Sequence, residues 1–154
     1  MALNSIDIAA PHQAVWSVLA DPRLYANWVV GASAARRVEG QWPAVGSVLH
    51  HTQALGVSDT TRVLESGPPW RIVMEARIRP VAIMKVSVEL DGHGDETHLV
   101  LREEVVGGAV AVLPKASLDW LIWLRNRESV RRIKELAEMG HGLGIPEAPS
   151  VNEV

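Results

Sequence analysis

The chain has 154 residues, of which 47% are hydrophobic and 21% are charged, and its formal net charge is −3. This length and composition are those of one globular domain and exclude a disordered chain. The weak negative charge disfavours nucleic acid as a partner, and the absence of cysteine excludes disulfides, thiolate catalysis and cysteine-ligated metals.

We expect a cytoplasmic protein. No segment has the roughly 18 consecutive apolar residues that a membrane-spanning helix needs, so no integral membrane contact is expected. The N-terminus lacks the basic and apolar regions of a secretion signal. One domain is predicted over residues 1–139, followed by a Gly- and Pro-rich flexible tail over residues 140–154.

The first thirty or so residues predict a strand and two short helices. Residues 3–9 alternate in polarity, as the residues of a strand do. Pro11 can open a helix because its missing N–H would have no partner in a first turn, and apolar residues follow it at helical spacing. Asp21 and Pro22 end that helix and begin a second short one, which includes Trp28.

The middle of the chain predicts a meander of six strands. Clusters of glycine, proline and aspartate interrupt runs of β-branched and alternating residues, and spacings of about eight to twelve residues suit antiparallel hairpins. The predicted strands span residues 33–39, 47–55, 58–66, 70–79, 82–91 and 96–106. Ile72 and Met74 share one face of their strand, whereas Arg71 and Glu75 share the other. An apolar element must therefore cover one face of the sheet.

Residues 115–139 predict the long helix that provides this cover. The segment follows Pro114, contains no glycine or proline, and ends before Gly140. At about 100° per residue, its inward stripe consists of Leu118, Ile122, Asn126, Ser129, Ile133, Leu136 and Ala137. The remaining faces carry arginine, lysine and glutamate at i,i+3 and i,i+4 spacing, Arg125 among them. We interpret them as a solvated surface with ion pairs rather than as an RNA-binding strip.

The element order and three local motifs resemble the START-like (SRPBCC, helix-grip) superfamily. The motifs are the segment from Ile8 to Pro22 that leads to Trp28, the turn from Gly67 to Ile72, and the segment from Asn126 to Lys134, which resembles the closing helix of bacterial polyketide cyclase/dehydrase-like members. The resemblance covers residues 3–139. It implies an α+β fold in which a seven-stranded antiparallel sheet curls around a long C-terminal helix, with two short helices after the first strand and a cavity between sheet and helix. Members include lipid carriers, aromatase/cyclases and quinone-binding subunits, so the fold alone does not fix the function.

A histidine is expected beside the cavity. Adjacent strand residues point to opposite faces, so either His50 or His51 faces the apolar side, as a ligand donor, a general base or a hydrogen-bonded structural imidazole. The same geometry prevents the two imidazoles from binding one metal ion. Because no metal-ligating or nucleotide-binding motif occurs either, neither a metal site nor a cofactor is predicted.

Polar residues interrupt the apolar pattern at three further positions. Glu103 falls in phase with Leu99 and Leu101, and an inward carboxyl group could act as an acid or base, unless the strand end opens to water there. Asn126 and Ser129 on the inward stripe suit a helix that faces a ligand or water, although Ser129 can also bond to a carbonyl one turn earlier. The candidate ligand-binding residues are Trp28, His50, His51, Met74, Val88, Glu103, Ile122, Asn126 and Ser129, and the catalytic candidates among them are His50, His51 and Glu103.

The start of the long helix is apolar on every side over residues 120–124. Trp120 and Leu124 point away from the inward stripe. We expect the loop over residues 107–114 to cover them or a homodimer contact to bury them. A lipid surface is disfavoured because the flanking charge is mixed.

Three functions follow from these observations. The preferred one is binding of a small hydrophobic or aromatic molecule between sheet and helix, without turnover. The alternative is a polyketide cyclase/dehydratase-type lyase in which a cavity histidine or glutamate moves a proton. The third is a protein-interaction module that uses Trp120 and Leu124.

Overall fold

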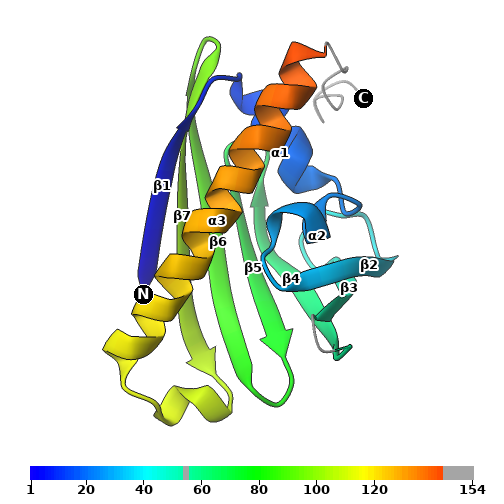
Figure 1. Cartoon of the computed structure of the whole chain (residues 1–154). Helices are drawn as coiled ribbons and strands as arrows, with labels where there is room; N and C mark the ends of the chain where they lie inside the picture. Colours follow the sequence, from blue (N-terminus) through cyan, green and yellow to red (C-terminus); the bar gives the residue numbers. More distant parts are fainter. Residues whose placement is uncertain (54–55, 144–154) are drawn as a thin grey trace.

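The structure is a computed structural model that describes residues 1–53 and 56–143 (Figure 1). In chain order its elements are β1 (Ala2–Ile8), α1 (His12–Ala20), α2 (Tyr25–Trp28), β2 (Ala32–Glu39), β3 (Val48–Gln53), β4 (Ser58–Gly67), β5 (Arg71–Ile78), β6 (Ala82–His93), β7 (Glu96–Gly107), the 3-10 helix η1 (Ala109–Val112) and α3 (Lys115–Gly142). The seven strands form one antiparallel sheet in the order β1-β7-β6-β5-β4-β3-β2. The predicted α+β helix-grip fold is confirmed.

The predicted strands agree with the observed ones to within two residues. The last two residues of the strand predicted over 47–55 lie outside the described residues. The long helix does not stop at Gly140 as predicted but continues to Gly142, and the N–H of Leu143 donates to the carbonyl of Met139 at 3.1 Å. From residue 144 on, the predicted tail lies outside the described residues.

The long helix α3 crosses one face of the sheet diagonally, with α1 and α2 beside it (Figure 1). Its inward stripe is the predicted one near its centre, and the buried residues are Ile122, Asn126, Ser129, Val130, Ile133 and Ala137. Each fully buried aliphatic side chain stabilises the fold by about 1.5–3 kcal/mol. The outward faces carry ion pairs at i,i+3 and i,i+4 spacing, which are Arg131 with Glu128 and Glu135, Arg132 with Glu128, and Lys134 with Glu138.

The two faces of the sheet differ as the alternation predicts. Ile72, Met74 and Ala76 of β5 are buried under the helices, whereas Arg71 is exposed on the outer face. Val73 departs from this rule because it is fully buried although it lies on the outer face. Long charged side chains of the neighbouring strands surround it there, and their alkyl stems can cover an apolar residue while the charged groups stay in water.

The chain turns from β7 into η1 at Gly108. The backbone there has φ +94°, and a Cβ atom would lie 2.5 Å from the carbonyl oxygen of Val81, so only glycine fits without a shift of the backbone. The N–H of Val110 then donates to the same Val81 oxygen at 3.0 Å. This turn fixes η1 against the β5–β6 hairpin and leads the chain into α3.

The N-terminal turns of α3 are exposed. Trp120 is 60% exposed and Leu124 is 47% exposed, so η1 and the residues around it do not cover them as we expected. The ammonium group of Met1 pairs with Asp119 at 2.6 Å, and this contact ties the start of β1 to the start of α3. Among the described residues, no helix combines the length and hydropathy required to span a bilayer.

Candidate functional site

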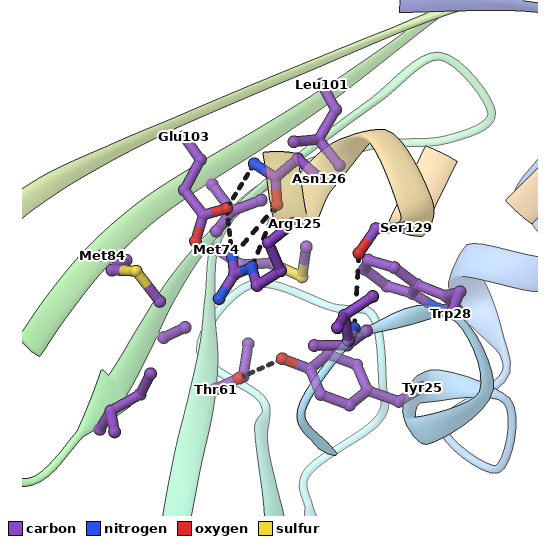
Figure 2. Close-up of a pocket in the computed structure, with 15 residues that line it drawn as sticks. Tyr25, Trp28, Thr61, Met74, Met84, Leu101, Glu103, Arg125, Asn126 and Ser129 are labelled. Carbon is purple, nitrogen blue, oxygen red and sulfur yellow. Dashed lines mark hydrogen bonds and ion pairs between the residues drawn. The ribbon is translucent and has the colours of Figure 1, made fainter. Parts of the chain in front are cut away.

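A cavity lies between the sheet and the middle of α3, where α2 and the loop after it close one side (Figure 2). Its wall is mainly apolar, with a few polar groups placed among methionine and aliphatic side chains. The lining residues are Tyr25, Trp28, Val29, Val30, Thr61, Met74, Ala76, Ile78, Met84, Val86, Leu101, Glu103, Arg125, Asn126 and Ser129. An apolar wall with few polar groups is the usual composition of a small-molecule site.

The cavity is narrow. The volume open to the centre of a water molecule is about 30 Å³, and one water needs roughly 10–15 Å³ measured in this way. The space as observed therefore admits about two water molecules, and a larger ligand enters only if side chains move. Met74 and Met84 lie in the wall, and methionine is the apolar side chain that changes shape most readily.

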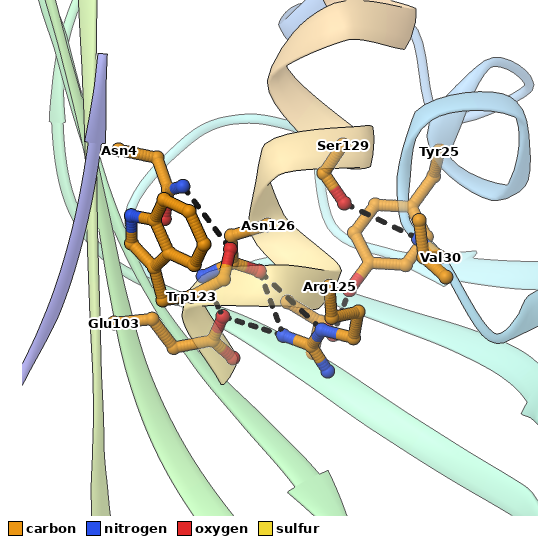
Figure 3. A network of polar contacts seen from close by, with 9 residues as sticks. Asn4, Tyr25, Val30, Glu103, Trp123, Arg125, Asn126 and Ser129 are labelled. Atoms are coloured by element: carbon orange, nitrogen blue, oxygen red, sulfur yellow. Dashed lines mark hydrogen bonds and ion pairs between the residues drawn. The ribbon is translucent and has the colours of Figure 1, made fainter. Parts of the chain in front are cut away.

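Glu103 carries a carboxylate into this apolar wall. Its side chain is 2% exposed. Its Oε2 atom accepts a hydrogen bond from Nη2 of Arg125 at 2.5 Å and another from Nδ2 of Asn126 at 2.6 Å (Figure 3). The predicted inward orientation of Glu103 therefore has a physical basis, because a buried carboxylate needs a cation or strong donors beside it.

Arg125 connects this cluster to solvent. The guanidinium group also donates to Oδ1 of Asn126, from Nε at 3.3 Å and from Nη2 at 3.2 Å. The arginine side chain is 29% exposed, so it lies at the edge of the cavity rather than at its floor. Oε1 of Glu103 is buried and has no partner among the described residues. The cluster thus combines a partly exposed cation with a carboxylate oxygen that is free to accept a further hydrogen bond.

Ser129 closes the opposite side of the cavity. Its Oγ atom accepts a hydrogen bond from the backbone N–H of Val30 at 3.4 Å (Figure 3). This contact joins α3 to the loop after α2, in place of the local bond to a carbonyl one turn earlier that the sequence left open. At the other edge of the helix, Nδ2 of Asn4 donates to the carbonyl of Trp123 at 3.1 Å. The helix is therefore fixed to α2 and to β1 on either side of the Glu103 cluster.

A second polar group lies on the wall formed by α2, β3 and β4. The Tyr25 hydroxyl is 2.7 Å from Oγ1 of Thr61, and Nε2 of His51 is 3.0 Å from the same oxygen. Burial raises the pKa of Tyr25 to about 12, against the opposing effect of its hydrogen bond with Thr61. Burial also lowers the pKa of His51, while the carboxylate of Asp59 acts in the opposite direction.

The structure brings together five of the predicted ligand-binding residues, which are Trp28, Met74, Glu103, Asn126 and Ser129. Val88 and Ile122 are buried, but neither lines the cavity. His51 is the inward histidine and lies behind Tyr25, with ring centroids 5.0 Å apart. His50 points away from the cavity, where its Nε2 pairs with Oε1 of Glu39 at 3.0 Å, because neighbouring strand residues face opposite ways.

Sequence reasoning missed three polar residues of the cavity. Arg125 was assigned to the ion-paired surface of the helix, but it turns inward to Glu103. Tyr25 and Thr61 were not singled out. Thr61 precedes a charged residue in a predicted strand, and its contact with Tyr25 joins positions 36 residues apart. Arg125 directly precedes Asn126, so it lies at the edge of the inward stripe, and a long arginine side chain there can reach a carboxylate in the cavity. This position could have indicated that the Arg125 side chain turns inward.

Arg102 of β7 and Arg77 of β5 pair outside the cavity. Nη1 of Arg102 pairs with Glu89 at 2.6 Å, and Nε of Arg77 pairs with Glu75 at 2.7 Å. These two pairs leave Arg125 as the cation that reaches Glu103 within the described residues. In that part of the chain, no three His, Cys, Asp or Glu side chains are grouped so as to hold a metal ion.

Comparison with known proteins gives matches of two kinds. A family model described as "Polyketide cyclase / dehydrase and lipid transport" matches residues 4–138. The solved structure of the Zhui aromatase/cyclase from Streptomyces sp. R1128 has a TM-score of 0.70 and 18% identity, and the match covers 91% of this chain and 94% of that one. Protein CV1439 from Chromobacterium violaceum gives a TM-score of 0.64 with 20% identity, covering 90% of this chain and 99% of that one.

A third solved structure is longer than this chain. DynU16, from the dynemicin biosynthetic locus, has a TM-score of 0.62 and 20% identity, and the match covers 96% of this chain but 49% of DynU16. At these identities the three structures show a shared fold. No curated protein matches the chain.

Proposed function

The chain belongs to the polyketide cyclase / dehydrase and lipid transport family, and from this membership together with the geometry of the cavity we propose that it binds a small apolar or aromatic molecule between the sheet and α3. The observation that carries this proposal is the cluster of Glu103, Arg125 and Asn126 in an otherwise apolar wall. A solid core gains nothing from a buried charge pair, because apolar residues of the same volume are commonly as stabilising.

The cluster also supports a proposal for the polar group of the ligand. A carbonyl, carboxylate or phenolate oxygen can accept from the guanidinium of Arg125, and a hydroxyl group can donate to the free Oε1 of Glu103. The methionine and aliphatic side chains bind the apolar part of the same molecule. We therefore propose an aromatic or polyene-like body with one oxygen group at the Arg125 end.

Entry of the ligand requires the cavity to widen. Arg125 is partly exposed, so its guanidinium can move toward water and still donate to a ligand oxygen that enters beside Asn126. Met74 and Met84 can change rotamer at small cost because methionine is unbranched.

The test uses two fluorescent probes of nearly the same shape. The first, 1-anilinonaphthalene-8-sulfonate, carries an anion, whereas N-phenyl-1-naphthylamine is neutral. We expect both to bind, and Arg125→Met should weaken the anionic probe about tenfold, as the loss of one charge-assisted hydrogen bond implies. The neutral probe should be almost unaffected. Arg77→Met, which removes an arginine from the outer face, is the matched control.

A further variant shows whether the probes enter the cavity. Ala76 lines it, so Ala76→Phe should reduce the binding of both probes. If this variant binds them as the unaltered protein does, the probes occupy the exposed apolar surface around Trp120 and the proposal fails. Native mass spectrometry of freshly purified protein then identifies the natural ligand class through any molecule that co-purifies.

We propose an enzyme of the cyclase/dehydratase type as the second candidate function. The supporting observation is the pairing of a carboxylate with a cation inside the cavity. Glu103 can remove a proton from carbon between two carbonyl groups, and Arg125 can stabilise the enolate that forms. Glu103→Gln should then abolish turnover of a synthetic diketide or triketide while its affinity is kept. A binding protein without turnover should show no reaction with either form.

We also propose that the exposed apolar surface at the start of α3 forms a contact between two copies of the chain. Over residues 107–124 the only charged side chains are Lys115 and Asp119, and the latter is neutralised by the terminal ammonium. A second copy offers the same apolar surface across a two-fold axis. Light scattering should show a dimer that Trp120→Ser converts to a monomer. A monomer in both forms contradicts the contact.

A further inference from the structure

The proposed function uses the wall of the cavity that carries Glu103 and leaves the wall formed by α2, β3 and β4 unexplained. Four polar residues follow one another there, from Asp59 through His51 and Thr61 to Tyr25. All four are nearly inaccessible, with exposed fractions from 1% to 4%. Of the four, Tyr25 and Thr61 line the cavity itself (Figure 2). Each of these residues loses hydration on folding, so their common position calls for a physical reason.

The hydrogen bonds of this wall define a direction. Oγ1 of Thr61 is 2.7 Å from the Tyr25 hydroxyl and 3.0 Å from Nε2 of His51. A threonine hydroxyl has one hydrogen to donate and lone pairs to accept with. If Thr61 donates to His51, then Tyr25 must donate to Thr61, and the chain of hydrogens points from the cavity toward the imidazole.

Asp59 lies at the imidazole end of this series of residues. It lies directly opposite His51 in the pairing of β3 with β4. Its Oδ1 accepts from the N–H of Arg79 at 3.1 Å. Its Oδ2 and the Nδ1 of His51 are both buried and without partners among the described residues. No hydrogen bond joins the two side chains, but the charge of the carboxylate raises the pKa of the imidazole against the effect of burial. We assign the proton of the neutral imidazole to Nδ1, which leaves Nε2 as an acceptor for the Thr61 hydrogen.

We infer that Asp59, His51, Thr61 and Tyr25 form a relay that accepts a proton from a hydroxyl or enol group of the ligand at the Tyr25 end of the cavity. This inference rests on the proposed function, since it requires a ligand in the cavity. It adds a second oxygen group to that ligand, an ionisable O–H, at the wall opposite Glu103. Tyr25 is the residue that contacts the ligand, and the other three act through it.

The proton transfer balances in atoms and charge. The ligand O–H bond breaks and its proton goes to the Tyr25 oxygen, while the Tyr25 proton passes to Oγ1 of Thr61. The Thr61 proton then passes to Nε2 of His51. The products are a ligand oxyanion and an imidazolium with protons on both nitrogens, and the carboxylate of Asp59 stabilises this cation. No oxidant, reductant or other reactant takes part.

The surroundings keep His51 in its neutral form. The ionisable groups that act on it are Asp59 on β4 and the adjacent His50 on β3, and the ring of Tyr25 on α2 lies beside it. Burial lowers the pKa of His51, and His50 acts in the same direction, so the imidazole is neutral at neutral pH. The carboxylate partly offsets this effect and makes the imidazolium accessible when a ligand supplies the proton.

The first test needs no ligand. Nitrogen-15 NMR of histidine-labelled protein at neutral pH should show His51 as the neutral tautomer with its proton on Nδ1. Thr61→Val removes the donor to Nε2 and should shift the Nε2 resonance, whereas Thr61→Ser keeps a hydroxyl and should leave it nearly unchanged. A proton on Nε2 in the unaltered protein overturns the relay, because the imidazole then has no atom to accept a proton from Thr61.

The second test measures the transfer with 4-nitrophenol, whose anion is yellow. Quenching of tryptophan fluorescence reports binding, and absorbance reports ionisation of the bound probe. We expect the bound probe to be several-fold more ionised in the unaltered protein than in Thr61→Val, at similar affinity. Equal ionisation at equal affinity refutes the relay. If the probe does not bind at all, the proposed function is contradicted, and the tautomer of His51 still decides whether the relay exists.

Discussion

The pair formed by Glu103 and Arg125 gives the sharpest test of the site through stability. Glu103 is 2% exposed and Arg125 is 29% exposed, with 2.5 Å between Oε2 and Nη2. Breaking a buried ion pair by removing one partner costs about 3–5 kcal/mol. Because Arg125 is partly exposed, water can reach the carboxylate when the guanidinium is removed, and Asn126 still donates to it. We therefore expect Arg125→Met to cost about 2 kcal/mol, or about 4–8 °C in Tm.

The opposite substitution should cost less. Glu103→Gln keeps the shape of the side chain, and the guanidinium it leaves behind can turn toward solvent, so we expect a loss of about 1 kcal/mol. The double variant removes both charges and should lose about 1 kcal/mol rather than 3. Urea denaturation of the four proteins gives a coupling energy, expected near 2 kcal/mol.

The control for this cycle is the pair of Arg77 with Glu75 on the outer face of the sheet. Its arginine is 45% exposed, and exposed ion pairs contribute about 0–1 kcal/mol. Arg77→Met should therefore change stability little. If the Glu103 and Arg125 substitutions prove additive, the two charges do not interact in the folded protein, and the cluster on which the proposed ligand chemistry depends is absent.

Three further predictions concern the buried wall and the backbone. Tyr25 is the chain's only tyrosine, so ultraviolet titration should give a single phenolate midpoint, with a pKa of about 12. A midpoint near the usual tyrosine pKa of about 10 would show that the hydroxyl is exposed. Because burial lowers the pKa of His51, the unfolded chain binds this proton first as pH falls below about 6.5. Stability should fall in that range by up to about 1.4 kcal/mol per pH unit, and His51→Gln should flatten the profile of urea midpoints. Gly108→Ala should destabilise the protein by more than about 2 kcal/mol, because the new Cβ atom meets the carbonyl oxygen of Val81. Gly140→Ala should stabilise α3 by up to about 1 kcal/mol, because nothing lies within 4 Å of its Cβ position. Equal effects of the two changes on the urea midpoint would contradict this reasoning.

The sheet and the long helix could be predicted because each is long and regular. Alternation over β5 and β6, and the apolar stripe of α3, each extend over enough residues to determine which face is buried. The phase of Leu99 and Leu101 indicated the inward side for Glu103, although the sequence left open whether the strand end meets water there. The end of α3 was less certain, because a glycine inside a helix costs only about 1 kcal/mol, and the helix continues through Gly140.

The choice between the two histidines could not be made from the sequence. Val48, Leu49, His51 and Thr52 of β3 are all buried, so this strand shows no alternation that fixes its phase. Long side chains add a second difficulty. The guanidinium of Arg125 lies several bonds from its backbone, so the helical angle of its Cα atom does not tell where the charge lies.

The cavity retains polar groups at a cost to stability, and this cost is itself an argument for function. Glu103 Oε1, Trp28 Nε1 and His51 Nδ1 are buried without partners among the described residues, at or directly behind the cavity wall. Each unsatisfied buried polar atom costs about 1–3 kcal/mol, which is a large share of the roughly 5–15 kcal/mol by which a domain is stable. Methionine or leucine at position 103 would avoid the desolvation of a carboxylate, as Met74 of β5 and Leu101 of β7 do. A ligand with oxygen groups at both ends would satisfy the two of these atoms that belong to cavity-lining residues, Glu103 Oε1 and Trp28 Nε1. Such a ligand should therefore raise Tm more than an aromatic hydrocarbon of equal size, and equal shifts would show that these atoms take no part in binding.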